Sequence, residues 1–121
     1  KCRFREAISI AMRLASETNR YLDKKAPWHE VKEDTALAAN TLWTALNSIS
    51  TLKTVLAPFL PFTSKKLQSM AGFPKTIEEI GWEIQPPQAG QVISNPTPLF
   101  SKIDPAVVGR EEQLLATRSG R

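Results

Sequence analysis

Two long runs with helical spacing, separated by a proline, constrain this sequence more than any other feature. Across residues 4–22, apolar and small side chains recur at intervals of four and three, which places them along one face of a helix. The same spacing holds across residues 38–56. Pro27 lacks an amide hydrogen and disfavours the helical conformation in the residue before it, so the first helix should end near Lys25. The two runs therefore predict an antiparallel pair of long helices and an all-α fold.

The residues between these runs predict a short helix and a capped helix start. Residues 27–33 should form one helical turn with Pro27 at its first position. Asp34 or Thr35 can cap the next helix by accepting its free amide hydrogens. Trp43 lies beside the apolar stripe of that helix, and we expect it to pack in the core or at its edge. Four positions of the same helix are more polar: Asn47, Ser48, Thr51 and Lys53.

A proline-rich corner follows the second run. Pro58 and Pro61 force a bend before a third helix, which we expect from about residue 61 to residue 70. Gly72 is placed to close that helix. Five apolar side chains of this region are expected to cover the end of the helix pair: Phe59, Leu60, Phe62, Leu67 and Met70.

The last third of the chain should be mostly irregular. Residues 76–80 can form one helical turn, and a loop rich in proline and glycine comes after it. Asp104 followed by Pro105 is a favourable helix start. The final helix should run over residues 105–116, before a frayed end at residues 119–121.

Charge is distributed unevenly over the chain. The 121 residues are enough for one domain with a modest core. The net charge is +4 and the sequence pI is about 9.5, which favours a polyanionic partner. Seven basic residues lie in the first 25, against three acidic ones. A solvated helix face explains such a bias more often than nucleic acid does.

Several function classes are disfavoured by what the sequence contains. Cys2 and His29 are the only residues of their types, so the chain can form neither an internal disulfide nor a structural zinc site by itself, and it suits a reducing compartment. Its glycines are not spaced as a phosphate-binding loop, and no catalytic pairing can be identified. No apolar run approaches the length of a membrane span, and no signal peptide is recognisable. Because Lys1 lies inside a helical pattern, we expect the chain to be a piece of a longer protein.

The end of the first helix is the candidate site. Arg20 and Lys24 lie on its outer face, and Trp28 is the first large side chain after its end. An aromatic ring beside positive charge can stack a single-stranded base. From these residues alone, however, a tryptophan packed under the turn of a helical hairpin is the favoured interpretation. Asp23 opposes the negative end of the helix dipole. It is therefore either a functional position or a solvated acid paired with Lys24 or Lys25.

Five segments, taken in order along the chain, resemble the anticodon-binding domain of methionyl-tRNA synthetases. They are residues 4–7 (Phe-Arg-Glu-Ala), 19–21 (Asn-Arg-Tyr), 26–28 (Ala-Pro-Trp), 55–61 (Val-Leu-Ala-Pro-Phe-Leu-Pro) and 96–104 (Pro-Thr-Pro-Leu-Phe-Ser-Lys-Ile-Asp). The terminal Pro-Leu-Phe-x-Lys-Ile-Asp motif favours the methionine enzyme over related class I synthetases. The similarity covers nearly the whole chain.

The resemblance implies a helix bundle that recognises the CAU anticodon of methionine tRNA. By matching the family's residues, Trp28 stacks on the first anticodon base beside Pro27. Asp23 and Asn19 would offer polar contacts to base edges, with Arg20 on the same approach. Two lysines would contact the RNA backbone: Lys24 and Lys25. With the resemblance, base stacking by Trp28 becomes the favoured interpretation over burial.

The resemblance also implies a larger parent. The parent would be an ATP-dependent methionine–tRNA ligase. ATP would bind in a separate catalytic domain of the same chain, and zinc is a further candidate ligand of that domain. The part described by this sequence would hold no cofactor, metal or active site. The family carries an Asn-x-x-x-Arg helix that would lie before Lys1, so part of the first helix's apolar face should be exposed here. The segment after Leu99 would pack towards the catalytic domain. We expect a cytoplasmic protein, with an organelle as the alternative.

These inferences divide the chain into three parts. Residues 1–72 should form the helical anticodon-binding bundle, residues 73–103 an irregular extension, and residues 104–121 a C-terminal helix with a frayed tail. Two other functions remain open: a helical structural or protein-interaction domain, and the equivalent domain of another class I synthetase.

Overall fold

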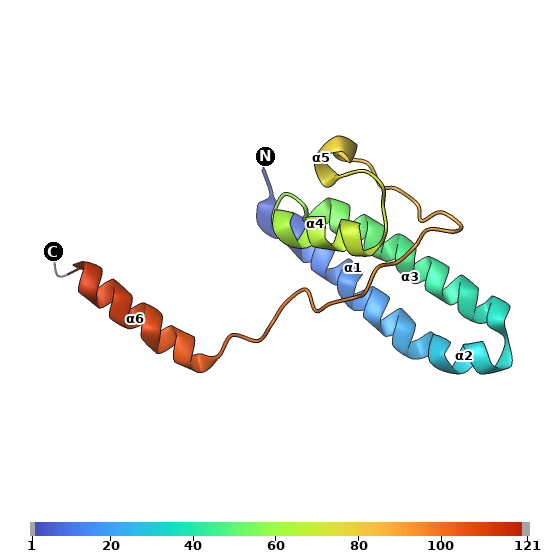
Figure 1. Cartoon of the computed structure of the whole chain (residues 1–121), viewed down its shortest axis with the longest axis horizontal. Helices are drawn as coiled ribbons and strands as arrows, with labels where there is room; N and C mark the ends of the chain where they lie inside the picture. Colours follow the sequence, from blue (N-terminus) through green and yellow to red (C-terminus); the bar gives the residue numbers. More distant parts are fainter. Residues whose placement is uncertain (1, 120–121) are drawn as a thin grey trace.

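Figure 1 shows the computed structural model, which describes residues 2–119. All regular secondary structure within these residues is helical, which confirms the predicted fold class. The predicted starts and ends hold to within a few residues throughout. The helices are α1 (Phe4–Lys25), α2 (Pro27–Glu33), α3 (Thr35–Leu56), α4 (Pro61–Met70), α5 (Ile77–Ile80) and α6 (Pro105–Ser119).

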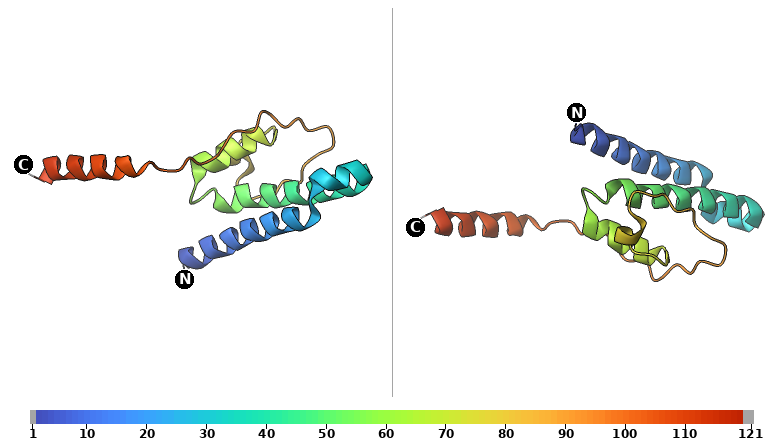
Figure 2. Two further views of the ribbon diagram at one scale, coloured as in Figure 1. Left: turned by 90° about the horizontal axis from the view of Figure 1, so that it is seen from below. Right: turned by 90° about the horizontal axis from the view of Figure 1, so that it is seen from above.

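Helix α3 lies at the centre of the molecule. Figure 2 shows α1 running antiparallel along one side of α3, with α4 and α5 on the other side. Small side chains are buried where α1 and α3 meet, namely Ala11, Ala38 and Ala45, so the two helices can approach closely. Helix α2 reverses the chain between them and packs on the first part of α3. The predicted antiparallel pair is thus confirmed.

The caps of the helices follow the predicted chemistry. The Asp34 carboxylate accepts the backbone N–H groups of Ala36 and Leu37 at 2.8 and 3.2 Å, and so caps the start of α3. Thr76 and Glu79 form a reciprocal capping box at α5. These contacts satisfy amide groups that a helix start otherwise leaves unpaired.

Helix α4 is rotated relative to the expected arrangement. Phe62 was expected to cover the end of the helix pair, but its side chain is 85% exposed, and Leu60 is also exposed. The buried side of α4 instead carries Ser64 and Gln68. These two residues are four apart and share one face, whereas Phe62 lies about 200° around the helix from Ser64. Phe59, Leu67 and Met70 are half-buried as expected.

Lys53 is a second departure from the sequence prediction. It was assigned to the polar positions of α3, yet only 1% of it is exposed. Its Nζ atom lies 4.4 Å from the centroid of the Phe73 ring, a cation–π geometry. The segment after α4 lies over this side of α3, because Ser50 and Thr54 donate hydrogen bonds to the carbonyl oxygens of Gln85 and Glu83.

The chain after α4 wraps back over the helices and then leaves them. The Ser94 N–H donates to the Met70 carbonyl at 3.0 Å, and Lys66 Nζ donates to the Pro98 carbonyl at 3.0 Å. Beyond this point α6 projects away from the other helices (Figures 1 and 2). It extends three residues past the predicted end, to Ser119. The rest of the predicted frayed tail, residues 120 and 121, lies outside the described residues.

Much of the apolar face of α1 is open near its N-terminal end. Phe4 is 66% exposed, and Ile8 and Ile10 are exposed as well, as expected for part of this face. A largely apolar cleft of about 550 Å³ lies between this end of α1 and the last turns of α3, with Trp82 at its edge. Among the described residues, no helix has both the length and the apolar character to cross a membrane. The three-part division of the chain remains a prediction.

Candidate nucleic-acid interface

The junction between α1 and α2 rests on one unusual backbone conformation. Ala26 has φ 48° and ψ 62°, the left-handed region, and is the only residue other than glycine with positive φ in the described part of the chain. Its N–H donates to the Leu22 carbonyl at 2.8 Å, while its own carbonyl accepts the N–H groups of His29 and Glu30 at 2.7 and 3.1 Å. This residue therefore both ends α1 and starts α2.

Helix α2 has an inner and an outer face. Pro27 and Glu30 are buried against the bundle, and Glu30 Oε2 accepts a hydrogen bond from Thr41 Oγ1 of α3 at 2.7 Å. Trp28 points the other way and is 53% exposed. The His29 ring lies against the edge of the Trp28 ring, with centroids 6.3 Å apart and an interplanar angle of 60°. One indole is thus held at the corner with much of its surface open to solvent.

The last turns of α1 present polar side chains beside this corner. Asn19 and Asp23 are exposed and four residues apart, so they lie one above the other on the helix surface. Within the described residues neither side chain makes a hydrogen bond or an ion pair. Arg20 is exposed and pairs with Glu17 at 3.0 Å, which leaves most of its guanidinium donors free. Lys24 and Lys25 are exposed in the final turn.

The first 25 residues have an excess of positive charge, which is spread along α1 and the residues before it. Residues 1–25 contain seven basic and three acidic residues, while residues 26–121 contain nine of each. The whole net charge of +4 therefore belongs to the first 25 residues. On α2, Glu33 is exposed and Glu30 is buried. An anion approaching the corner is consequently drawn towards the α1 side.

The structure brings together the seven residues predicted for the site. All lie on the end of α1 or the start of α2, and all are exposed except Pro27. Pro27 is buried at the first position of α2, so its contribution is to fix where Trp28 emerges rather than to offer a contact surface. Sequence reasoning missed the left-handed Ala26, the Glu30–Thr41 contact and the position of His29. The available sequence signal for Glu30 was a charged residue on the inner face of a short helix. No signal indicated the left-handed conformation of Ala26, because glycine is the usual residue in that conformation at a helix end.

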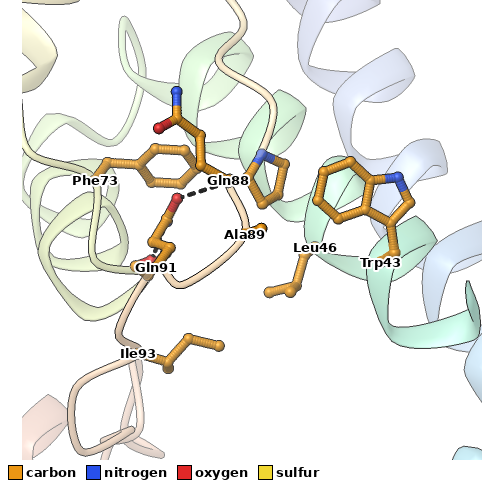
Figure 3. A pocket seen from close by; sticks show the side chains of 9 residues that line it. Trp43, Leu46, Phe73, Gln88, Ala89, Gln91 and Ile93 are labelled. Carbon is orange, nitrogen blue, oxygen red and sulfur yellow. Dashed lines mark hydrogen bonds between the residues drawn. The ribbon is translucent and has the colours of Figure 1, made fainter. Parts of the chain in front are cut away.

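Other features of the structure lie away from this corner. A cavity of about 190 Å³ between α3 and the loop after α5 is lined mostly by apolar groups, with Trp43, Leu46 and Phe73 among them (Figure 3). Trp43 lines this cavity but is 48% exposed, so it lies at the surface and not in the core. Within residues 2–119, no cluster of His, Cys, Asp or Glu could hold a metal ion.

The groups with shifted pKa values are also distant from the corner. Burial lowers the pKa of Lys53. A hydrogen bond from Lys65 lowers the pKa of Glu78, and the hydrogen bond from the Thr76 backbone lowers that of Glu79. None of these groups belongs to α1 or α2.

Comparison with known proteins gives matches over nearly the whole chain. The profile of the family described as "Anticodon binding domain of methionyl tRNA ligase" matches residues 1–117. The chain is 49% identical over 110 residues to a methionine–tRNA ligase of Dehalococcoides mccartyi, covering 91% of this chain and 20% of that protein. It is 37% identical to the enzyme of that name from Thermomicrobium roseum, covering 90% of this chain and 23% of that protein, and 33% identical to the one from Chloroflexus aggregans, covering 98% and 24%. The chain thus spans between a fifth and a quarter of the length of these relatives.

Proposed function

Because this chain belongs to the family of methionyl-tRNA ligase anticodon-binding domains, we propose that it recognises the CAU anticodon of methionine tRNA at the α1–α2 corner. The observation that carries the proposal is the exposed indole of Trp28 next to the exposed basic side chains at the end of α1. Bases of an RNA loop are unstacked, and an aromatic side chain can replace the lost stacking. Trp28 stacks on one anticodon base and so anchors the loop.

Base identity is read by the polar groups beside the indole. Asn19 offers both a donor and acceptors, and Asp23 offers acceptors only. Their side chains are unpaired within the described residues, so both can turn to a base edge without breaking an existing contact. An acceptor such as Asp23 favours a base that presents an amino group, as cytosine and adenine do. Its unfavourable place at the end of α1 is consistent with a functional role.

The basic side chains of α1 hold the RNA backbone. Arg20, Lys24 and Lys25 are exposed on the same end of the helix, and each phosphate that they neutralise releases a counterion. Affinity for RNA should therefore fall as salt concentration rises. Pro27 takes part indirectly, because its buried ring fixes the start of α2 from which Trp28 projects.

The parent protein is proposed to be an ATP-dependent methionine–tRNA ligase of the cytoplasm, with an organelle as the alternative. In it, this domain positions the tRNA while a catalytic domain of the same polypeptide attaches methionine. The residues of this chain fit neither ATP nor zinc, since they contain no glycine-rich phosphate loop and, in the described part, no metal-binding cluster. We therefore place both groups in the remainder of the parent and derive no step through them.

The test is a binding titration of the 121-residue chain with a dye-labelled RNA hairpin that carries a CAU loop, followed by fluorescence anisotropy of the dye. Trp28→Ala should weaken binding by roughly 5- to 150-fold, since stacking on one base contributes about 1–3 kcal/mol. Trp82→Ala is the matched control, because Trp82 is also exposed but lies at the opposite end of the bundle.

Three outcomes would contradict the proposal. Equal binding by Trp28→Ala and the unaltered chain would remove the stacking role. Equal binding of hairpins with CAU and with unrelated anticodons would leave only a general RNA-binding or interaction domain. Preference for the anticodon of another amino acid would point instead to a different class I synthetase.

A further inference from the structure

We propose that the buried hydrogen bond between Glu30 and Thr41 sets the direction in which Trp28 faces, which makes both of them positioning residues for base stacking. The inference rests on the proposed role of Trp28. Neither residue is placed to touch RNA, because Glu30 is 9% and Thr41 only 1% exposed. They act through the orientation of α2.

The geometry of α2 links Glu30 to Trp28 directly. The two residues are two positions apart in a helix, so their side chains point about 200° away from each other. When the Glu30 carboxylate is held by the Thr41 hydroxyl at 2.7 Å, the opposite face of α2, with Trp28 on it, is directed to solvent. A rotation of α2 about its axis would break the hydrogen bond and turn the indole.

Packing alone does not explain a carboxylate at this position. Burying an ionised carboxylate has a high free-energy cost unless it is paired, and within the described residues Glu30 makes no ion pair. An apolar side chain would fill the same space at lower cost. A hydrogen bond has a preferred direction, which an apolar contact lacks. The Glu30–Thr41 hydrogen bond can therefore fix the rotation of α2 and, with it, the orientation of the Trp28 ring.

Helix α2 needs such a restraint because it is short. It has seven residues, and a helix of this length is not stable in water without tertiary contacts. The left-handed Ala26 fixes one end, and the Asp34 cap of α3 fixes the other. Between these two ends, the Glu30–Thr41 hydrogen bond connects the middle of α2 to α3.

The experiment compares four variants of the full 121-residue chain. Glu30→Ala and Thr41→Val remove the hydrogen bond from either side, and Glu30→Gln keeps an oxygen that can accept from Thr41. Glu33→Ala is the matched control, because Glu33 is exposed on the same helix and its loss removes the same charge. Two quantities are measured: affinity for the labelled CAU hairpin, and the fluorescence anisotropy of Trp28 without RNA, in a background carrying Trp43→Phe and Trp82→Phe.

We expect Glu30→Ala and Thr41→Val to lower RNA affinity by about tenfold, as loss of a hydrogen bond to a charged group does, and to lower the Trp28 anisotropy. Glu30→Gln should recover most of both. Loss of a negative charge alone should strengthen RNA binding, as Glu33→Ala will report, so weaker binding by Glu30→Ala cannot be an effect of charge.

Several results would overturn the inference. One is an unchanged Trp28 anisotropy in both Glu30→Ala and Thr41→Val; another is a Glu30→Gln variant as impaired as Glu30→Ala. Circular dichroism melts of each variant separate a local loss of order from unfolding, and Glu30→Gln and Thr41→Val still decide the matter if Glu30→Ala unfolds. If the unaltered chain fails to bind the CAU hairpin, the proposed function fails, while the anisotropy measurement still decides whether Glu30 orients Trp28.

Discussion

At the scale of single residues, Ala26 stores backbone strain at the start of the binding corner. A non-glycine residue in the left-handed region costs about 1–2 kcal/mol, and here three backbone hydrogen bonds hold it in place. Ala26→Gly should remove the strain while adding about 0.4–1 kcal/mol of chain entropy to the unfolded state. We therefore expect a net gain in the free energy of unfolding of about 0.5–1 kcal/mol, measured by urea denaturation.

The matched control for this prediction is Ala57→Gly. Ala57 caps α3 in the ordinary right-handed region, with φ −54°, so glycine brings no relief there and should lower stability. A loss of stability in Ala26→Gly comparable to that in Ala57→Gly would show that the left-handed conformation of Ala26 carries no strain.

Lys53 should give the folded protein a pH dependence of its own. Burial lowers the pKa of its amine in the folded state below 10.5, so between these two values the unfolded chain binds more protons than the folded chain. Stability from this group therefore rises with pH through the folded pKa and levels off near 10.5, with a slope of at most about 1.4 kcal/mol per pH unit.

Replacement by methionine tests this directly. In Lys53→Met the unbranched apolar chain fills a similar volume, and the rise in stability as the pH approaches 10.5 should shrink. Denaturant titrations at several pH values measure the difference. Lys32→Met, at an exposed lysine of α2, is the control. An identical pH profile in Lys53→Met and the unaltered chain would refute the prediction.

The chemistry of the candidate site could be read from the sequence further than its geometry could. A proline stop, a tryptophan after it and basic residues before it are all local signals, and they predicted which residues gather at the corner. Whether Trp28 faces solvent could not be decided locally, because that depends on how α2 packs on α3. The contact responsible joins Glu30 to Thr41, eleven residues apart, and no periodicity indicates such a pairing.

At the scale of elements, local sequence signals again predicted some features, whereas features set by packing could not be predicted. Helix boundaries were predictable because Pro27, Pro61 and Gly72 act on their own backbone and that of their neighbours. The buried sides of α3 and α4 were not, because both helices bury polar residues such as Lys53 and Gln68 under the extension that follows them. Hydrophobic periodicity cannot predict a contact in which polar side chains of a helix donate hydrogen bonds to an irregular segment.

Gly72 marks the point where this extension turns back on α4. Its φ is +76°, and a Cβ built there would lie 2.0 Å from the Val92 carbonyl oxygen. Gly72→Ala should thus combine left-handed strain with a backbone clash and lower the free energy of unfolding by about 2 kcal/mol or more. Thermal and urea denaturation would measure the loss.

Gly90→Ala separates these two effects. Gly90 has a similar φ of +81°, but a Cβ there would meet no atom within 4 Å. Its replacement should cost only the strain of about 1–2 kcal/mol. If Gly72→Ala proves no more destabilising than Gly90→Ala, the close approach of the Val92 carbonyl is not a constraint on the fold.

At the scale of the whole molecule, the helix bundle with the candidate site is distinct from the C-terminal helix α6. The bundle end formed by α1 and α2 carries the exposed Trp28 beside Arg20, Lys24 and Lys25, whereas residues 104–121 contain three basic and three acidic residues. Helix α6 projects away from the bundle (Figure 1), and the side chains described for it are almost all exposed. The C-terminal part should accordingly contribute little to RNA binding or to the stability of the bundle.

Removal of residues 104–121 tests this separation. The shortened chain should keep its free energy of unfolding within about 0.5 kcal/mol, because no buried contact is lost, and should keep its affinity for the CAU hairpin. The slope of log affinity against log salt, about 0.7 for each contacted phosphate of a single strand, should also be unchanged, because the net charge and the basic face of α1 remain.

Removal of residues 91–121 is the contrasting case. It deletes the Gln91 side chain that donates to the Ala71 carbonyl and the Ser94 N–H that donates to the Met70 carbonyl, so it should destabilise the bundle. A smaller salt slope in the first deletion would mean that α6 reaches the RNA, which its position and its balanced charge argue against.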